Sequence, residues 1–447
     1  MLCQFSFQNF KSYKNETVFD FQAVPTIQEF SESLISSDKG EDLLPVGVIY
    51  GPNGGGKTNL LQAFTCLVSA VAQPTCELRK NRQRIILQQR VTAEPFRFDE
   101  TSAAEPTAFQ VFFRQKGYEY RYYLALKDDE VVAETLDRRV LGGKRPAHIF
   151  YRSGKDIQPG PLLKKENVNT NVNAKMPYLS FLAINYEIPV IAEAQTWFES
   201  CIVRNYANPT MEHTIMISEK EEFKRQILRF LNDMGIDISD YRFDEEEKQL
   251  YILRRINGQT YELPFDHESD GTRKLIAALP VIYVALQEGR LVVIDELDTK
   301  LHPKLLRYVI ALFKNRLINR RGAQLLFTSH DMATMKNTVF RRDEIWFAAL
   351  GPEHDSEIYS LYDIRRENGE RVNSTAAFDK QYLEGRYGAD PYSGRCWIGG
   401  MESEPPAAEK ERSWKVVDAA PAGPDDKDPA RVPPDRLGGD GDRAGVL

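Results

Sequence analysis

The stretch Gly51-Pro52-Asn53-Gly54-Gly55-Gly56-Lys57-Thr58 has the spacing of a complete glycine-rich phosphate-binding loop. The apolar run Pro45 to Tyr50 precedes it and predicts a buried strand, and the run Asn59 to Phe64 predicts a helix. Glycines are needed in such a loop because several backbone N–H groups point at one anion, whose approach a Cβ would block. The anion would also lie at a helix N-terminus, where the partial positive charge attracts it. A glycine-rich turn without a ligand is the alternative, and strand, loop and helix in register disfavour it.

The polar residues of this loop have expected roles toward a nucleotide. Lys57 is expected to reach the β- and γ-phosphates, and the Thr58 hydroxyl is expected to ligate Mg²⁺. The predicted cofactors are therefore ATP and Mg²⁺. The candidate nucleotide-binding residues in this segment are Gly51, Asn53, Gly54, Gly56, Lys57, Thr58 and Asn59.

Two further apolar runs end in polar residues. Leu291 to Ile294 is followed by Asp295 and Glu296, which predicts a buried parallel strand that delivers two acids to its C-terminal edge. Asp295 is the expected partner of Mg²⁺ through water, and Glu296 is placed to deprotonate the water that attacks the γ-phosphate. An acidic turn after an apolar strand is also common without any catalytic role.

The third run, Ala323 to Phe327, ends in Thr328-Ser329-His330-Asp331. His330 is a candidate contact for the γ-phosphate, although a single histidine more often has a structural role. Three strands that end in polar residues indicate one common edge of a sheet.

These motifs carry a family resemblance. The order of phosphate loop, long insertion, Glu268-Ser269-Asp270-Gly271-Thr272, Asp295-Glu296-Leu297-Asp298 and Ser329-His330-Asp331 resembles the ABC-type ATPases of the SMC and recombination-repair group. More narrowly, it is similar to bacterial AAA-core ATPases of phage-defence and abortive-infection modules. Phe5 to Tyr13 is similar to the opening strand of that group. The resemblance covers residues 1–72 and 262–350, and the middle of the chain is outside it.

The resemblance implies an α/β fold, a P-loop NTPase with an ABC-type mixed sheet core and an inserted β and helical lobe. It also implies that Ser269 and Gly271 bind the γ-phosphate held by a second subunit, so that the chain self-associates as an ATP-sandwich dimer or higher oligomer. Asp298 would communicate between the two sites. This segment departs from the transporter form Leu-Ser-Gly-Gly-Gln, and an ordinary helix cap is the alternative for Ser269.

The function implied by the resemblance is ATP hydrolysis that regulates a separate effector protein in anti-phage defence. Three alternatives stay open: a DNA-repair or DNA-tethering ATPase, a regulatory module that holds ATP with little turnover, and a transporter ATPase. The transporter fits least, because the long aromatic insertion does not suit docking to a membrane subunit.

Composition bears on the compartment and on partners. The 447 residues are 42% hydrophobic, and no apolar stretch approaches the roughly 20 residues that span a bilayer. The five cysteines are scattered, which favours a reducing compartment and disfavours zinc. We therefore expect a cytoplasmic protein without a membrane partner. The net charge of −7 gives no global attraction to DNA, and the short basic runs 79–84 and 316–321 leave local nucleic acid contact open.

The pattern along the chain predicts a split organisation. Residues 1–75 and 262–395 are expected to form the ATPase core, 76–140 a β-rich lobe, 141–261 an inserted helical and loop lobe, and 396–447 a disordered tail. Within the lobes we expect strands at 108–113 and 118–126, loops over 141–175, helices within 177–205 and 219–234, and a hairpin at 250–263. Asp440 and Asp442 have the spacing of a nuclease pair but lie in the predicted tail, so any nuclease is expected to be a separate polypeptide.

Overall fold

The computed structural model describes residues 1–37, 39–78, 91–206, 221–351, 353–366, 369–389 and 414–416. These residues form a six-stranded mixed sheet, a seven-stranded antiparallel sheet and smaller sheets, with helices packed against them. No helix among them has the length and apolar character required to cross a membrane.

The six-stranded sheet has the order β16-β15-β3-β14-β13-β9. Its strands are β3 (Val46–Tyr50), β9 (Ile202–Asn205), β13 (Leu291–Asp295), β14 (Gln324–Thr328), β15 (Ile345–Leu350) and β16 (Ser356–Ser360). All neighbours are parallel except β15 and β16. Strands β3 and β14 are buried along their whole length, as expected for parallel strands covered on both faces.

Alternate residues of this sheet enter two different cores. Val48 and Ile294 lie in the core formed with α7 (Glu221–Asp233), α8 (Asp270–Glu288) and α9 (Pro303–Lys314). Ile49 and Val293 lie in the core formed with α1 (Lys57–Leu78) and the seven-stranded sheet. The two-residue period of the strands therefore joins both halves of the molecule through a single sheet.

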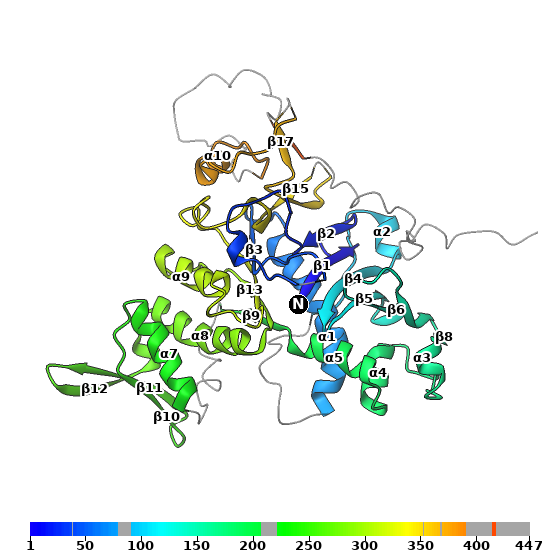
Figure 1. Cartoon of the computed structure of the whole chain (residues 1–447), viewed down its shortest axis with the longest axis horizontal. Helices are drawn as coiled ribbons and strands as arrows, with labels where there is room; N and C mark the ends of the chain where they lie inside the picture. Colours follow the sequence, from blue (N-terminus) through cyan, green and yellow to red (C-terminus); the bar gives the residue numbers. More distant parts are fainter. Residues whose placement is uncertain are drawn as a thin grey trace, which may run out of the picture.

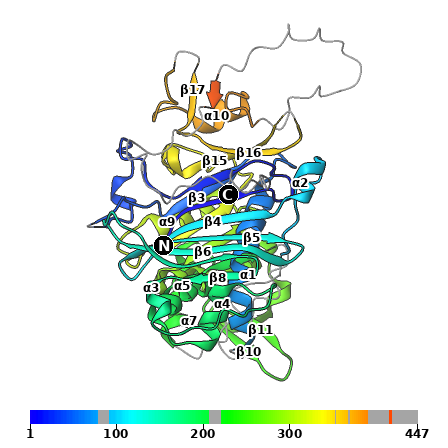
Figure 2. The ribbon, with the colours of Figure 1, turned by 90° about the vertical axis from the view of Figure 1, so that its right-hand side faces the viewer.

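The seven-stranded sheet has the order β2-β1-β4-β5-β6-β7-β8. Its strands are β1 (Leu2–Gln8), β2 (Thr17–Asp20), β4 (Thr107–Gln115), β5 (Tyr118–Lys127), β6 (Glu130–Val140), β7 (Ala147–Ser153) and β8 (Asp156–Pro159). Figure 2 shows its strands as a layer between β3 and β15 on one side and α3, α4 and α5 on the other. In this sheet β1 pairs with β2 on one side and with β4 on the other, where Gln8 is in register with Ala108.

The helices fall into two groups around the six-stranded sheet. The bounds are α1 (Lys57–Leu78), α2 (Glu100–Ala104), α3 (Pro161–Lys164), α4 (Tyr178–Asn185), α5 (Pro189–Ser200), α7 (Glu221–Asp233), α8 (Asp270–Glu288), α9 (Pro303–Lys314) and α10 (Phe378–Leu383). Helices α4 and α5 pack on α1, and α7 packs on α8. Phe223, Ile227, Phe230 and Leu231 form the buried face of α7, which confirms the amphipathic helix predicted there.

A small antiparallel sheet extends from the body next to α7 and α8 (Figure 1). We call this sheet the arm; it consists of β10 (Asp240–Asp244), β11 (Gln249–Ile256) and β12 (Gln259–Pro264). Asn257 and Gly258 have φ values of 51° and 81°, the left-handed conformation that a two-residue type I′ turn requires. The hairpin predicted around these two residues is confirmed.

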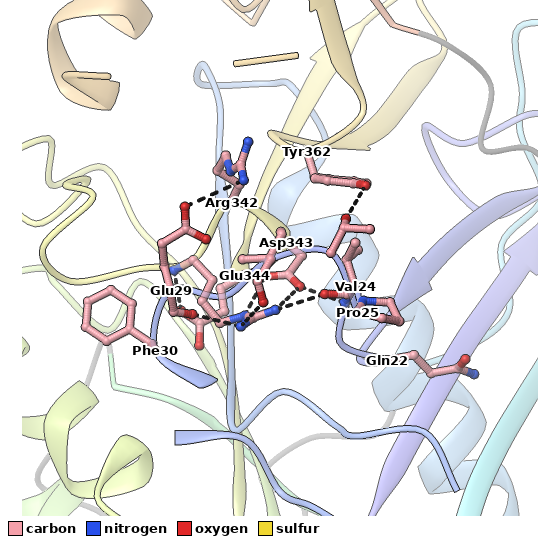
Figure 3. A network of polar contacts seen from close by, with 12 residues as sticks. Gln22, Val24, Pro25, Glu29, Phe30, Arg342, Asp343, Glu344 and Tyr362 are labelled. Atoms are coloured by element: carbon pink, nitrogen blue, oxygen red, sulfur yellow. Dashed lines mark hydrogen bonds and ion pairs between the residues drawn. The ribbon is translucent and has the colours of Figure 1, made fainter. Parts of the chain in front are cut away.

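The connection between β2 and β3 is fastened by a buried polar network (Figure 3). Arg341 is 1% exposed and donates to the Asp343 carboxylate at 2.8 and 2.9 Å and to the carbonyl oxygen of Glu29 at 2.8 Å. The Val24 N–H also donates to the Asp343 carboxylate, at Oδ2, at 2.9 Å. Because the buried charges are paired and hydrogen-bonded, the network fixes this long connection against η4 (Arg342–Glu344).

Three predictions need correction. Residues 147–153 and 156–159 form β7 and β8, where loops were expected, because His148 to Arg152 pair with the edge of β6. Residues 202–205 were expected to be helical, and they form β9, because their backbone pairs in parallel with β13. Of the predicted disordered tail, residues 414–416 form β18, which pairs with β17 (Ile364–Arg366).

The two basic runs have different outcomes. Residues 79–84 lie outside the described part of the chain, as do Asp440 and Asp442. In the other run, Arg316 donates to the Asn319 carbonyl at 3.1 Å and Arg320 to the Leu317 carbonyl at 2.9 Å, so both guanidinium groups stabilise the turn after α9. The proposed division into domains stays a prediction.

Candidate nucleotide-binding site

The C-terminal ends of β3, β14 and β13 lie next to each other at one edge of the six-stranded sheet. Thr328 is in register with Ile49, and Phe327 is in register with Ile294. The phosphate loop after β3, the acids at the end of β13 and the polar run after β14 therefore meet at this edge. This is the position at which open α/β sheets bind ligands.

The loop backbone has the conformation that its glycines permit. Gly51, Gly54 and Gly56 have φ values of 146°, 82° and 103°. A Cβ on Gly51 would lie 2.1 Å from the carbonyl oxygen of Ala348, and one on Gly56 would lie 2.4 Å from Ser356 Oγ. At Gly54 nothing is within 4 Å, so only the backbone conformation requires glycine there. The loop forms a cradle that fits a phosphate chain.

Residues from distant parts of the chain hold this loop in place. Tyr13 donates from its hydroxyl to the Gly56 carbonyl at 3.2 Å. Asn59 donates from its amide to Ser12 Oγ at 2.8 Å, and Ser356 Oγ also donates to Ser12 Oγ, at 2.8 Å. The structure therefore places the Asn59 side chain on Ser12. Asn53 is exposed at the tip of the loop.

Lys57 lies at the first position of α1 and is 7% exposed. Its ammonium group donates to the carbonyl oxygens of Gly51 at 2.8 Å and Pro52 at 2.9 Å. Burial lowers the pKa of Lys57 to about 8, and the carboxylates of Asp295 and Glu296 oppose this shift. A buried ammonium group beside a glycine cradle fits a polyphosphate, because an anion would relieve the cost of its desolvation.

The two predicted Mg²⁺ ligands, Thr58 and Asp295, are in contact with each other. Thr58 donates from Oγ1 to Asp295 Oδ2 at 3.0 Å, and Thr328 donates from Oγ1 to Asp295 Oδ1 at 2.7 Å. Mg²⁺ prefers hard oxygen ligands and keeps several waters, so this hydroxyl and carboxylate fit it. Thr328 orients the carboxylate from the neighbouring strand.

Glu296 has a left-handed backbone with a φ of 50°. Such a conformation costs a residue with a Cβ about 1 kcal/mol, so the surrounding contacts must hold it. The Glu296 N–H donates to Thr328 Oγ1 at 2.7 Å, and the Glu296 carbonyl accepts from Lys274 Nζ at 2.5 Å and from the Thr299 N–H at 3.2 Å. The backbone is held on both sides, and the carboxylate is at the surface of the site.

The His330 N–H donates to Asp298 Oδ2 at 2.9 Å, which links the end of β14 to the turn after β13. Partial burial and the nearby Lys57 ammonium lower the pKa of His330, whereas Asp298 and Glu296 raise it. The neutral imidazole is favoured, and it can donate one hydrogen bond to a phosphate oxygen.

Ser269 is the N-cap of α8. Its Oγ accepts from the Thr272 N–H at 3.2 Å, which is the helix-capping geometry that was the alternative for this residue. In the described residues, its side chain makes no hydrogen bond with the loop 51–58 of the same chain. A Cβ on Gly271 would lie 2.7 Å from the Lys300 carbonyl oxygen, so α8 begins in close contact with the turn after β13.

Sequence reasoning missed several residues of the site. Thr328 was quoted in a motif without a role. Ser12, Tyr13 and Ser356 have no local signal, because they reach the loop or the neighbouring Asn59 from more than forty residues away in the chain. Lys274 could have been found. It lies four residues before Ala278 and seven before Val281, both buried, so a charge occupies the apolar stripe of α8.

The fold and this site together define a class of protein. A phosphate loop between a buried parallel strand and a helix, with a carboxylate pair and a polar run at neighbouring strand ends, is the core of a P-loop ATPase of the ABC and SMC type. The family model described as "AAA domain, putative AbiEii toxin, Type IV TA system" matches residues 47–336, and the chain belongs to this family. A comparison with the curated proteins found no match.

Three solved structures show partial similarity to this chain. The SMC head domain from Thermotoga maritima is 13% identical with a TM-score of 0.38, and the SmcHead bound to the C-winged helix domain of ScpA is 13% identical with a TM-score of 0.42. Each alignment covers 80% of this chain and 98% of the other. The cbiO1 protein from Clostridium perfringens, part of an ABC transporter complex, is 14% identical with a TM-score of 0.21 over 40% of this chain and 61% of its own. The family assignment rests on the family model alone.

Proposed function

We propose that this protein binds ATP with Mg²⁺ in the loop 51–58 and hydrolyses it. The observation that carries the proposal is the chain of hydrogen bonds from Thr58 through Asp295 and Thr328 to the backbone of Glu296. It joins the loop, the metal-binding acid and the candidate base into one unit, although they come from three strand ends. A turn without a ligand has no need for such an arrangement.

Each residue of this unit has a role in phosphoryl transfer. The backbone N–H groups of the loop and Lys57 bind the phosphates, and Thr58 and Asp295 would hold Mg²⁺, which supplies neutralisation of phosphate charge. Glu296 accepts a proton from the attacking water as general base. His330, as a neutral donor, contacts the γ-phosphate and aligns it.

We also propose that a second copy of the chain completes the site. Ser269 and Gly271 are exposed or half-buried at the N-terminus of a 19-residue helix, where the partial positive charge suits a phosphate. Since these residues make no hydrogen bond with the loop of their own chain, a nucleotide held by another copy is the fitting ligand. ATP would then join two copies, and hydrolysis would release them.

The outcome of this cycle is proposed to be control of a separate effector in anti-phage defence. The family's description names a putative toxin of a type IV toxin–antitoxin system, which is a system of more than one component. The arm is connected to the start of α8, because Arg254 of β11 forms a two-pronged ion pair with Glu268, the residue before Ser269. Ile256 and Tyr261 are 51% and 53% exposed on the arm and would offer apolar contacts to that partner.

The test compares the wild type with Glu296→Gln, and with Glu288→Gln as a matched control. Glu288 is a surface carboxylate of α8 that pairs with Arg290, outside the site. Turnover of ATP should fall about 100-fold or more in Glu296→Gln, the range of general-base catalysis, and stay unchanged in the control. Mass measurements should show ATP-dependent association that persists in Glu296→Gln. Equal turnover in all three proteins would overturn the hydrolytic mechanism.

A further inference from the structure

A buried lysine outside the sequence-predicted site contacts the backbone of the candidate base. Lys274 lies five residues after Ser269 on α8 and is 4% exposed. Its ammonium group donates to the Glu296 carbonyl at 2.5 Å and to the Thr299 carbonyl at 3.0 Å. Both acceptors belong to the turn that follows β13.

The position of this lysine is unfavourable by itself. The first turns of a helix carry a partial positive charge, and burial of an ammonium group costs free energy unless it is paired. The charges of Asp298 and Glu296 and the two carbonyls offset part of that cost, and the burial that remains uncompensated lowers the pKa of Lys274 to about 8. A residue that only filled space on this apolar face of α8 would not require a charge.

The contact acts on the strained part of the turn. Glu296 and Lys300 both have left-handed backbones, with φ values of 50° and 64°. Thr328 holds the Glu296 N–H, and Lys274 holds the Glu296 carbonyl, so the peptide planes on both sides of the base are fixed. The close approach of Gly271 to the Lys300 carbonyl gives α8 a second contact with the same turn. The backbone from which the Glu296 carboxylate extends is therefore held against the start of α8, and Thr299 of the same turn donates from Oγ1 to that carboxylate at 3.3 Å.

We propose that Lys274 is a positioning residue that couples the two nucleotide sites of the dimer. This inference rests on the proposed function. Ser269 at the start of α8 contacts the nucleotide held by the other copy, whereas Glu296 acts on the nucleotide held by its own loop. When Ser269 contacts the nucleotide of the other copy, α8 shifts, and Lys274 passes this shift to the Glu296 carbonyl. The shift thereby positions Glu296 for hydrolysis of the nucleotide in its own loop. Hydrolysis at the two sites is then cooperative.

The experiment uses full-length Lys274→Met, which keeps the side-chain length without the ammonium group, and Lys274→Arg, which keeps the charge. Lys314→Met is the matched control, because Lys314 is also buried and ion-paired, with Glu344 at 2.7 Å, away from the site. Nucleotide affinity, kcat, KM and the Hill coefficient for ATP are measured for each protein.

In Lys274→Met we expect nucleotide affinity within about twofold of the wild type and a kcat about 10- to 100-fold lower, as for a small displacement of a catalytic group. The Hill coefficient for ATP should fall to about 1, the value for independent sites. Lys274→Arg should restore part of the kcat and part of the Hill coefficient. Lys314→Met should keep the kinetic values at a temperature where it is folded.

The outcomes separate this inference from the proposed function. If Glu296→Gln does not reduce turnover, the proposed function fails and so does the coupling. If Glu296→Gln reduces turnover while Lys274→Met behaves as Lys314→Met does, only the coupling is overturned. Should Lys274→Met fail to fold, Lys274→Gln, whose shorter side chain also lacks the ammonium group, is measured in its place against the same expectations.

Discussion

The start of α1 and the start of α8 contain the same chemical arrangement and use it differently. Lys57 and Lys274 are both buried, each donates to two backbone carbonyl oxygens, and burial lowers the pKa of each to about 8. The carbonyls at Lys57 belong to a glycine loop whose tip is exposed. Those at Lys274 belong to the turn that carries the candidate base.

The difference lies in what can reach the ammonium group. At Lys57, residues 53 and 54 of the loop are exposed, so an anion can approach and replace the carbonyls as partner. Lys274 is 4% exposed, and the two carbonyl oxygens that it contacts belong to the turn after β13 rather than to an exposed loop. Similar geometry therefore serves ligand binding in one region and internal positioning in the other, and the surroundings alone decide which.

The largest expected effect is a difference between the Lys57 and Lys274 variants in their affinity for Mg·ATP. Lys57→Met should weaken Mg·ATP binding about 100-fold, because it removes a charge-assisted hydrogen bond to the phosphates, whereas Lys274→Met should leave binding almost unchanged. Titration with a fluorescent ATP analogue measures both. An equal loss of affinity in the two variants would show that the two ammonium groups do not differ in their access to the nucleotide.

A smaller effect is expected on the stability of the nucleotide-free protein. Lys274→Met should lower the free energy of unfolding by about 1–3 kcal/mol, because it leaves the Glu296 and Thr299 carbonyls without their buried donor. Lys57→Met should cost less, since water can reach the exposed side of the loop. Urea unfolding without nucleotide checks the order, and a larger cost at Lys57 would show that its contacts with the carbonyls are structural.

The smallest expected effect is a pH dependence that both lysines share. Their pKa of about 8 in the folded state is below the ordinary value of 10.5, so the unfolded chain holds protons that the folded chain has released between these values. Below pH 8 each buried ammonium group is charged and lowers the free energy of unfolding by its full desolvation cost. This cost disappears as the pH rises from about 8 to 10.5 and the folded protein releases the proton. The wild type should therefore gain stability relative to each methionine variant between about pH 8 and about pH 10.

The measurement is urea unfolding of the wild type and the two variants at several pH values, without nucleotide or Mg²⁺. The difference between proteins isolates the lysines, since other titrating groups are common to all three. If the difference in free energy of unfolding between the wild type and Lys274→Met did not change with pH, the Lys274 ammonium group would stay charged beside Asp298 and Glu296 over this pH range.

Local sequence was enough for the parts of the site whose chemistry is local. The strand–loop–helix order around Gly51, the acids after β13 and the hairpin at Asn257 each follow from backbone or periodicity rules over a few residues. Strands β7 and β9 were not predicted correctly, because their conformation depends on partners far along the chain. Strands as short as β7 and β9, which lie next to glycine and lysine residues or directly after a helix, show little alternation of apolar and polar residues from which a strand could be predicted.

The site shows the same division. Lys57, Thr58, Asp295 and Glu296 were placed in one site from sequence, and the hydrogen bond from Thr58 to Asp295 agrees with that arrangement. The direction of the Asn59 side chain toward Ser12 was not predictable, because Ser12 is brought there by the seven-stranded sheet. The roles assigned to Ser269 and His330 stay proposals for the experiments above.

The sequence by itself determined which residue types stand at the ends of three buried strands, since a glycine loop and an acid pair are recognisable from their immediate neighbours. It thereby determined the class of protein. Only the tertiary structure decided which groups hold those residues: Thr328 between the two acids, Tyr13 on the loop and Lys274 behind the base. Such contacts join residues twenty or more positions apart, and their geometry depends on how sheets and helices pack rather than on local pattern.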